Sequence, residues 1–156
     1  LDNTIDGQAG LPGSIYTENL NAKDFSDFNT VIYGHDMLDG SMFQNLHNYE
    51  DPTYFQEHSK VYIYTQEKKL TYEVFEAVVY DDRHILLSFD FTMNHQKQAY
   101  LDSLKAVREL GSNFNDNVQV GPESRIITMS TCIGDRPDNR YLVGAVLTDE
   151  YEYEAQ

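Results

Sequence analysis

The stretch of sequence that decides the fold is Thr128-Met129-Ser130-Thr131-Cys132-Ile133-Gly134-Asp135-Arg136-Pro137-Asp138-Asn139-Arg140. Its first residues close an apolar, β-branched run at 125–131, which is typical of a buried strand. Gly, Pro, Asp and Asn then indicate a loop, and Arg140 opens a second apolar run at 141–147. If these two strands pair antiparallel, Cys132 leaves one strand where Arg140 enters its neighbour. The sequence therefore predicts a thiol and a guanidinium close together at one rim of a sheet.

Working outward, several upstream segments have the composition of strands. We expect strands at 14–17 and at 30–33, and a hairpin formed by 61–65 and 71–80 around the polar turn at 66–69. A further strand is expected at 85–91. In the long hairpin strand, period-two alternation predicts two apolar faces, one with Tyr72, Val74, Val78 and Tyr80 and the other with Phe75, Ala77 and Val79. Both faces should therefore be covered.

Two segments have helical spacing instead. Residues 41–58 predict two short helices, the second beginning near Pro52. Residues 94–110 carry an apolar stripe, with Asn94 as the expected N-cap and Gly111 as the residue after the last turn. We interpret this stripe as covering the sheet; its members are Leu101, Leu104, Val107 and Leu110. The acidic tail at 149–154 is expected to be a solvated end.

Length and charge exclude several classes of protein. A chain of 156 residues suits one domain, and we treat 1–156 as a single unit. The 11 Lys and Arg against 26 Asp and Glu give a formal net charge of −15. Because nucleic-acid binding requires cations that neutralise phosphates, we expect no nucleic-acid partner. No apolar run is long enough to span a bilayer, and no cluster has metal-ligand spacing, so we expect neither a metal nor a cofactor.

Cys132 is the only cysteine, so the chain has no internal disulfide and no Cys-x-x-Cys pair. It is either an inert packing residue or a nucleophile. A cysteine nucleophile usually needs a histidine for proton transfer. Of five histidines, His35 follows an apolar strand and Gly34, which permits a sharp turn. We interpret the other four as surface or capping residues: His47, His58, His84 and His95.

Together these motifs resemble a sortase transpeptidase. Thr-x-Ser-Thr-Cys closes a strand, Tyr33-Gly34-His35-Asp36-Met37 lies upstream and Arg140 lies downstream, with Met129 where the family usually has Leu. The stretch from 31 to 58 and the helix at 94–110 resemble class B in particular, and the resemblance covers 14–147. It implies a mainly β fold: a closed eight-stranded barrel with inserted helices, including a long helix before the cysteine-bearing strand.

The resemblance also implies roles for individual residues. Cys132 is then the nucleophile, His35 the general acid and base, and Arg140 the cation that orients substrate or stabilises the oxyanion. Arg136 is the alternative for the cation, and Asp36 or Asp135 for orienting His35. The expected substrate-binding residues are Ser130, Tyr33 and Thr131.

The implied activity is cleavage of a sorting-signal peptide after threonine, through a thioester on Cys132, and transfer to an amine, which anchors surface proteins to the cell wall. The expected partners are the sorting peptide and either a peptidoglycan cross-bridge amine or a pilin lysine. The expected location is the extracellular face of a Gram-positive membrane, held by an N-terminal segment that, with the family's leading helices, would precede Leu1. Three alternatives remain open: a pilin-polymerising sortase, an L,D-type cysteine transpeptidase, whose Ser-His-Gly-Cys stretch is absent, and a non-catalytic β-domain with a structural cysteine.

Overall fold

The computed structural model describes residues 15–34 and 43–154. The strands are β1 (Tyr16–Thr17), β2 (Asn29–Tyr33), β3 (Lys60–Tyr64), β4 (Lys68–Asp81), β5 (Asn113–Phe114), β6 (Ile126–Cys132) and β7 (Asn139–Glu152). The helices are the 3₁₀ helix η1 (Gln44–Glu50), α1 (Pro52–Glu57), α2 (Ile85–Ser88) and α3 (Asn94–Lys105). The mainly β class is confirmed, as are the hairpin of β3 and β4 and the two short helices before it.

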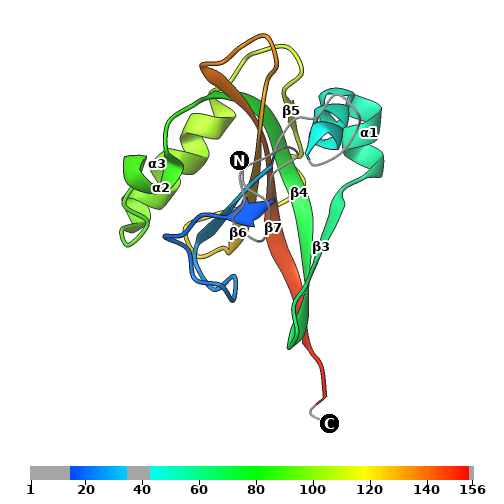
Figure 1. Ribbon diagram of the computed structural model, residues 1–156, viewed down its shortest axis with the longest axis vertical. Coiled ribbons are helices and arrows are strands. Elements are labelled where there is room, and N and C mark those ends of the chain that lie inside the picture. Colours follow the sequence, from blue (N-terminus) through cyan, green and yellow to red (C-terminus); the bar gives the residue numbers. More distant parts are fainter. Residues whose placement is uncertain (1–14, 35–42, 155–156) are drawn as a thin grey trace, which may run out of the picture.

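The strands of the described residues form one seven-stranded sheet in the order β1-β2-β6-β7-β4-β3, with β5 paired to β4 (Figure 1). Among the strands of residues 15–34 and 43–154, only β2 and β6 run parallel, and every other pair is antiparallel. The predicted closure into an eight-stranded barrel is not confirmed, because no hydrogen-bonded pair joins β1 to β3 within the described residues. The central strands β6, β7 and β4 carry the longest ladders of the sheet.

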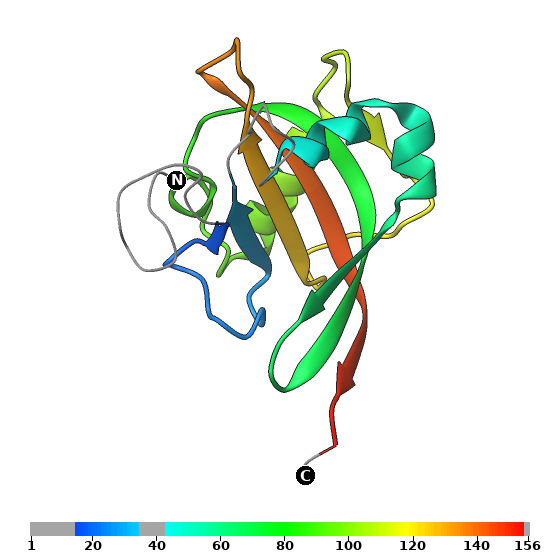
Figure 2. The same cartoon turned by 45° about the vertical axis from the view of Figure 1, so that its right-hand side comes forward.

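Helices lie on both faces of this sheet, α2 and α3 on one and η1 with α1 on the other (Figures 1 and 2). Each face has its own apolar core. The core under η1 and α1 includes Leu46, Phe55, Tyr72, Met129 and Tyr141. The core under α3 includes Val78, Tyr100, Leu104, Ile126 and Leu142. The prediction that the long hairpin strand is covered on both sides is therefore confirmed, and burial of each such side chain stabilises the fold by roughly 1.5–3 kcal/mol.

The predicted division of β4 into two faces is wrong beyond Val74. The register opposite β7 steps from Val74 with Ala145 to Glu76 with Gly144, so Phe75 is an extra residue in a β-bulge. A one-residue insertion moves all later side chains to the other face. Tyr72 and Val74 therefore share a core with Ala77 and Val79. The opposite core, under α3, receives Phe75, Val78 and Tyr80.

Residues 85–91 do not form the predicted strand. They begin with the short helix α2, in which the carbonyl of His84 accepts hydrogen bonds from the backbone N–H groups of Leu87 and Ser88 at 3.1 and 2.9 Å. Ile85 is buried, whereas Leu87 is 74% exposed. The short apolar run was compatible with either structure, because periodicity cannot separate a buried strand from a helix over so few residues.

The long helix is shorter than predicted. α3 begins at Asn94, with Met93 as its N-cap, and ends at Lys105. Just past this end, Arg108 Nη1 donates to the carbonyls of Lys105 and Val107 at 2.5 and 2.8 Å. These contacts satisfy carbonyl groups at the helix end and so favour termination there. Leu110, placed in the predicted stripe, is 97% exposed.

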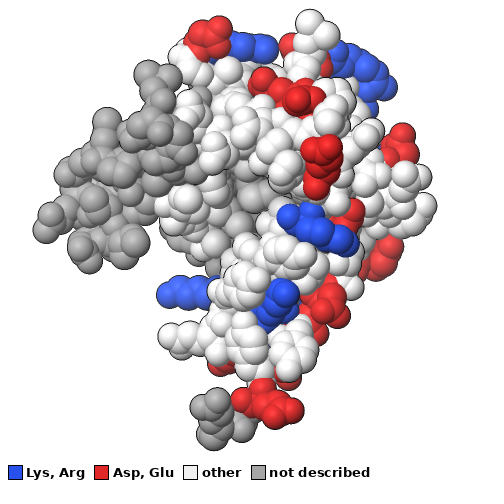
Figure 3. All heavy atoms as spheres, turned by 90° about the vertical axis from the view of Figure 1, so that its right-hand side faces the viewer, with Lys and Arg blue, Asp and Glu red and all other residues white. Residues whose placement is uncertain are grey.

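The acidic tail at 149–154 is exposed throughout, as predicted for a solvated end, but most of it also pairs in the sheet. β7 continues to Glu152, which pairs with Lys68 at the start of β4. The paired ends of β4 and β7 extend towards the C-terminus in Figure 1. Glu150 accepts from Lys68 Nζ at 2.6 Å and from Arg125 Nη1 at 2.9 Å. On the face that carries α1 and β3, basic side chains lie among acidic ones (Figure 3). No helix within the described ranges is long and apolar enough to cross a membrane.

Candidate active site

The rim where β6 ends and β7 begins brings two of the predicted site residues together. Cys132, the last residue of β6, pairs directly with Arg140, the second residue of β7. Residues directly opposite in an antiparallel pair project from the same face. The thiol of Cys132 is free and partly buried, and the connecting loop stands clear at the top of the sheet in Figure 2. The predicted antiparallel pairing that brings Cys132 and Arg140 together at one rim of the sheet is confirmed.

The guanidinium of Arg140 is hydrogen-bonded to the protein through one of its nitrogens. Its Nη1 donates to the carbonyls of Pro137 and Asn139, both at 2.8 Å. Within the part of the chain that the structure describes, its Nε and Nη2 make no hydrogen bond, so these donors are available to a ligand. Arg136 is held less firmly, since Nη1 lies 3.5 Å from Glu109 Oε2 and the side chain is 40% exposed. The geometry favours Arg140 over Arg136 for the cation role.

The expected substrate-binding residues fall on two faces. Ser130 lies two residues before Cys132 and therefore shares its face, and Tyr33 pairs with Ser130 across the parallel β2–β6 ladder. Thr131 alternates to the other face and is 1% exposed. Its hydroxyl oxygen finds no hydrogen-bond partner among the described residues. The structure thus groups Ser130 and Tyr33 with Cys132, and it does not support substrate contact for Thr131.

The charges around Tyr33 link β1, β2 and the rim. Burial, followed by the negative charge of Glu18, raises the pKa of Tyr33 to about 12, while the guanidinium of Arg140 acts in the opposite direction. Tyr33 therefore keeps its phenolic proton at neutral pH, and a hydrogen bond with the Glu18 side chain also favours this protonated form. Tyr16 packs against it with ring centroids 5.6 Å apart.

His35 and Asp36 lie outside the described residues, so the catalytic role of His35 stays a prediction. The backbone immediately before His35 is placed, however. Gly34 N donates to Ser130 O at 3.2 Å, which brings the chain alongside β6 two residues short of Cys132. A Cβ on Gly34 would lie 2.7 Å from ring atoms of Phe43. The glycine is therefore required by this close approach, whereas the sequence had suggested only a sharp turn.

Three of the other four histidines have defined partners, and one of these three reaches the site. His58 stacks on Tyr54 with centroids 3.8 Å apart, and His84 Nε2 lies 3.0 Å from Glu18 Oε2. His47, interpreted from the sequence as a surface or capping residue, lies with Nε2 3.0 Å from the carbonyl oxygen of Cys132. These two residues are 85 positions apart, and no local sequence pattern signals their contact.

Three comparisons with known proteins agree on the kind of protein. The family model described as "Sortase domain" matches residues 6–148. Sortase B of Listeria monocytogenes is 37% identical over 135 residues, which cover 85% of this chain and 52% of that protein. A solved structure of sortase B from the same species has a TM-score of 0.77 at 28% identity, with 94% of this chain and 79% of the other covered. The chain thus spans about half the length of the curated relative.

Two further solved structures contain bound molecules. A Staphylococcus aureus sortase B–substrate complex is 25% identical to this chain, with a TM-score of 0.78 and coverage of 95% and 68% of the two chains. A sortase B complexed with triglycine is also 25% identical, with a TM-score of 0.79 and the same coverage. The fold of this chain is therefore that of proteins whose structures are known with a substrate and with triglycine.

Proposed function

The chain belongs to the sortase family, and from that premise we propose that it is a cysteine transpeptidase of the class B type. It cleaves a sorting-signal peptide after threonine, holds the acyl fragment as a thioester on Cys132 and transfers it to an amine. The observation that carries this proposal is the pairing of Cys132 with Arg140 at the rim of the sheet. A nucleophile and an oxyanion donor must emerge on the same side of the scaffold to act on one carbonyl.

The roles follow from the chemistry of acyl transfer. The Cys132 thiolate attacks the threonine carbonyl, and the carbon–nitrogen bond breaks as His35 protonates the departing amine. Arg140 donates from Nε and Nη2 to the oxyanion that develops in between. The incoming amine then attacks the thioester and loses a proton to His35, and the thiolate leaves. A substrate groove that excludes water favours this second attack over hydrolysis.

The partners in this proposal are a sorting-motif peptide and an amine. The S. aureus sortase B–substrate complex and the sortase B complex with triglycine support one partner each. For the acceptor, we propose the amine of a peptidoglycan cross-bridge. A pilin lysine is the alternative, which would make the chain a pilin-polymerising enzyme.

The setting of the enzyme is proposed from the family as well. Residues 1–156 form a single catalytic domain whose barrel is closed, and the domain works at the extracellular face of a Gram-positive membrane, tethered by an N-terminal segment. Cleavage of sorting signals requires that the enzyme and its exported substrates meet on that side. Membrane fractionation of cells that express the full-length protein, followed by protease shaving of intact cells, tests this placement.

A peptide-library assay tests the activity itself. The chain is incubated with peptides that carry different sorting motifs, together with triglycine or a lysine-bearing pilin peptide as acceptor. Mass spectrometry should identify a fragment ending in threonine joined to the acceptor amine. His35→Ala should lose nearly all of this product. If no peptide is cleaved and the thiol of the folded chain does not react with alkylating reagents, the chain is the non-catalytic β-domain with a structural cysteine.

A further inference from the structure

We propose that His47 is a positioning residue for the nucleophile: its ring holds the backbone carbonyl of Cys132 and so fixes the end of β6 beneath the thiol. The inference deepens the proposed function, on which it rests, and concerns the same rim. η1 passes beside the upper end of β6 in Figure 2, and the His47 ring on it reaches the last residue of that strand. The contact joins a helix near the start of the described chain to the residue that performs the chemistry.

The ring of His47 has contacts in several directions. Nε2 lies 3.0 Å from Cys132 O, and because a carbonyl oxygen only accepts, Nε2 must carry the proton of this hydrogen bond. Nδ1 lies 3.4 Å from Glu50 Oε1 on the same helix. The ring stacks on Tyr141, with centroids 5.2 Å apart and planes inclined by 27°. Since Tyr141 is fully buried and donates to Gly111 O at 2.9 Å, the surface beneath His47 is rigid.

The orientation of the Cys132 carbonyl group affects the direction of the Cys132 side chain. Cys132 is the last residue of β6, and the loop to β7 follows it. A hydrogen bond to this carbonyl fixes the plane of the peptide group between Cys132 and Ile133. That restriction limits rotation about the Cα–C bond of Cys132 and hence the direction of its side chain relative to Arg140. Productive attack needs the sulfur within a few tenths of an ångström of its reacting geometry.

The position of His47 separates this role from acid–base catalysis. Tyr141, on which the ring stacks, belongs to the core under η1 and α1. Arg140 is its neighbour in β7 and therefore projects from the opposite face, together with Cys132. His47 thus lies on the far side of the sheet from the thiol and donates to a backbone oxygen. Proton transfer stays with His35, and His47 acts through the backbone of the nucleophile.

Three substitutions at His47 separate the contact from simple occupancy of the site. His47→Gln can place an amide N–H near the position of Nε2 and should retain at least about half of the wild-type kcat for peptide cleavage. His47→Asn places its N–H near Nδ1, too short to reach Cys132 O, and should lower kcat about 10-fold with KM nearly unchanged. His47→Ala should resemble His47→Asn. The matched control is His58→Ala, because His58 lies at the end of α1, where its ring stacks on Tyr54 and Nδ1 lies 3.1 Å from Tyr54 O.

A second measurement works without peptide cleavage. The rate at which iodoacetamide alkylates Cys132 in the folded chain should change about 3-fold or more in His47→Asn and stay close to wild type in His47→Gln. Equal kcat and equal alkylation rates in these two variants, both folded by circular dichroism, would overturn the positioning role. If the wild type cleaves no peptide but the two alkylation rates still differ, the proposed function fails while the positioning of Cys132 stands.

Discussion

Two titratable side chains pack against opposite faces of the same sheet, and their surroundings differ strongly. His47, under the rim, has a carbonyl, a carboxylate and an aromatic ring around it. Glu76, on β4 beneath α3, is 1% exposed, and neither oxygen of its carboxyl group has a hydrogen-bond partner among the described residues. The comparison shows that the polar ring of His47, next to the catalytic rim, is fixed by specific contacts. The carboxyl group of Glu76, in the core, is buried without such contacts.

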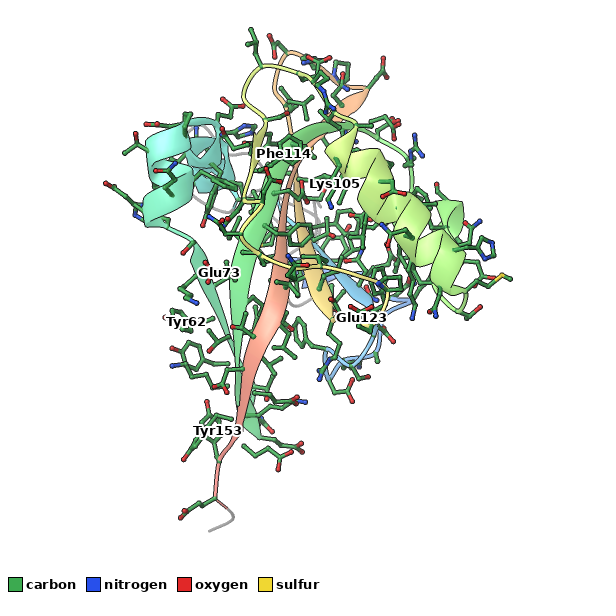
Figure 4. All side chains as sticks on the ribbon, turned by 180° about the vertical axis from the view of Figure 1, so that it is seen from behind. Tyr62, Glu73, Lys105, Phe114, Glu123 and Tyr153 are labelled. Carbon is green, nitrogen blue, oxygen red and sulfur yellow. The ribbon has the colours of Figure 1, made fainter. Side chains whose placement is uncertain are left out.

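The surroundings of Glu76 follow from the β4 bulge. The extra residue Phe75 places Glu76 opposite Gly144, where a Cβ would collide with the carboxyl oxygen Oε1. A cavity of about 120 Å³ lies beside it, lined by Leu101 and Leu104 and by more polar residues near its mouth. Figure 4 shows two of the lining residues, Lys105 on α3 and Phe114 on β5, near each other above the sheet. Burial raises the pKa of Glu76 to about 8, so the group is mostly neutral at pH 7.

The largest expected effect lies at the rim. Cys132→Ala should reduce cleavage of the sorting peptide by at least about 10⁴-fold, because a transpeptidase without its nucleophile forms no acyl-enzyme. The fold should survive, since Cys132 is only partly buried at a strand end and the lost sulfur leaves a small cavity. Steady-state kinetics and thermal melting measure the two effects. Residual cleavage, or a domain that no longer folds, would contradict the assignment of the nucleophile.

The next effect concerns the cation beside the thiol. Arg140→Lys should lower kcat/KM by roughly 10²–10³, because an ammonium cannot direct paired donors at an oxyanion as a guanidinium does. Arg136→Lys is the control and should stay within about 2-fold, since its contact with Glu109 is long and exposed. Both variants are compared on one peptide. A large loss at Arg136 with little at Arg140 would move the cation role into the loop.

The pairing at the rim was predictable from the sequence because its two residues lie close together in the chain. Cys132 and Arg140 bound one loop, so a single antiparallel pairing decides their contact. The faces of β4 were not predictable, because the bulge at Phe75 exists only in the register with β7. The contact of His47 with Cys132 and the isolation of Glu76 depend in the same way on segments far apart in the chain. The helix end at Lys105 was missed because the side chain of Arg108 caps it, which the apolar stripe does not reveal.

We expect Glu76 to make the stability of the fold depend on pH. The folded-state pKa of Glu76, about 8, lies above the value of about 4.3 expected in the unfolded chain. The contribution of protonated Glu76 to the free energy of unfolding is therefore fully present below pH about 4. It is lost as the pH rises towards 8, by about 1.4 kcal/mol per pH unit in that window. Glu76→Gln, which cannot ionise, should gain on the wild type by a margin that grows from pH 5 to pH 8.

Urea unfolding at several pH values measures this margin. The control is Glu73→Gln, since Glu73 is three residues away on the same strand but pairs with Lys60 near the surface. Its difference from the wild type should stay within about 1 kcal/mol and vary little over the same range. A flat difference for Glu76→Gln would mean that the carboxylate is stabilised in the fold, which would remove the contrast with His47.

The smallest effect tests whether Gly144 is there to make room for Glu76. Gly144→Ala brings a Cβ against Oε1 of Glu76 and within 2.9 Å of the Phe75 ring, and such overpacking typically costs about 1–3 kcal/mol. In a Glu76→Ala background the carboxyl clash is gone and only the Phe75 contact remains, so the same change should cost about 1 kcal/mol less. The free energies of unfolding of the four chains in this cycle, taken at pH 5 where Glu76 is neutral, give the coupling. A coupling near zero would show that the backbone shifts to accept the methyl group, and that the bulge, not the glycine, makes the space for Glu76.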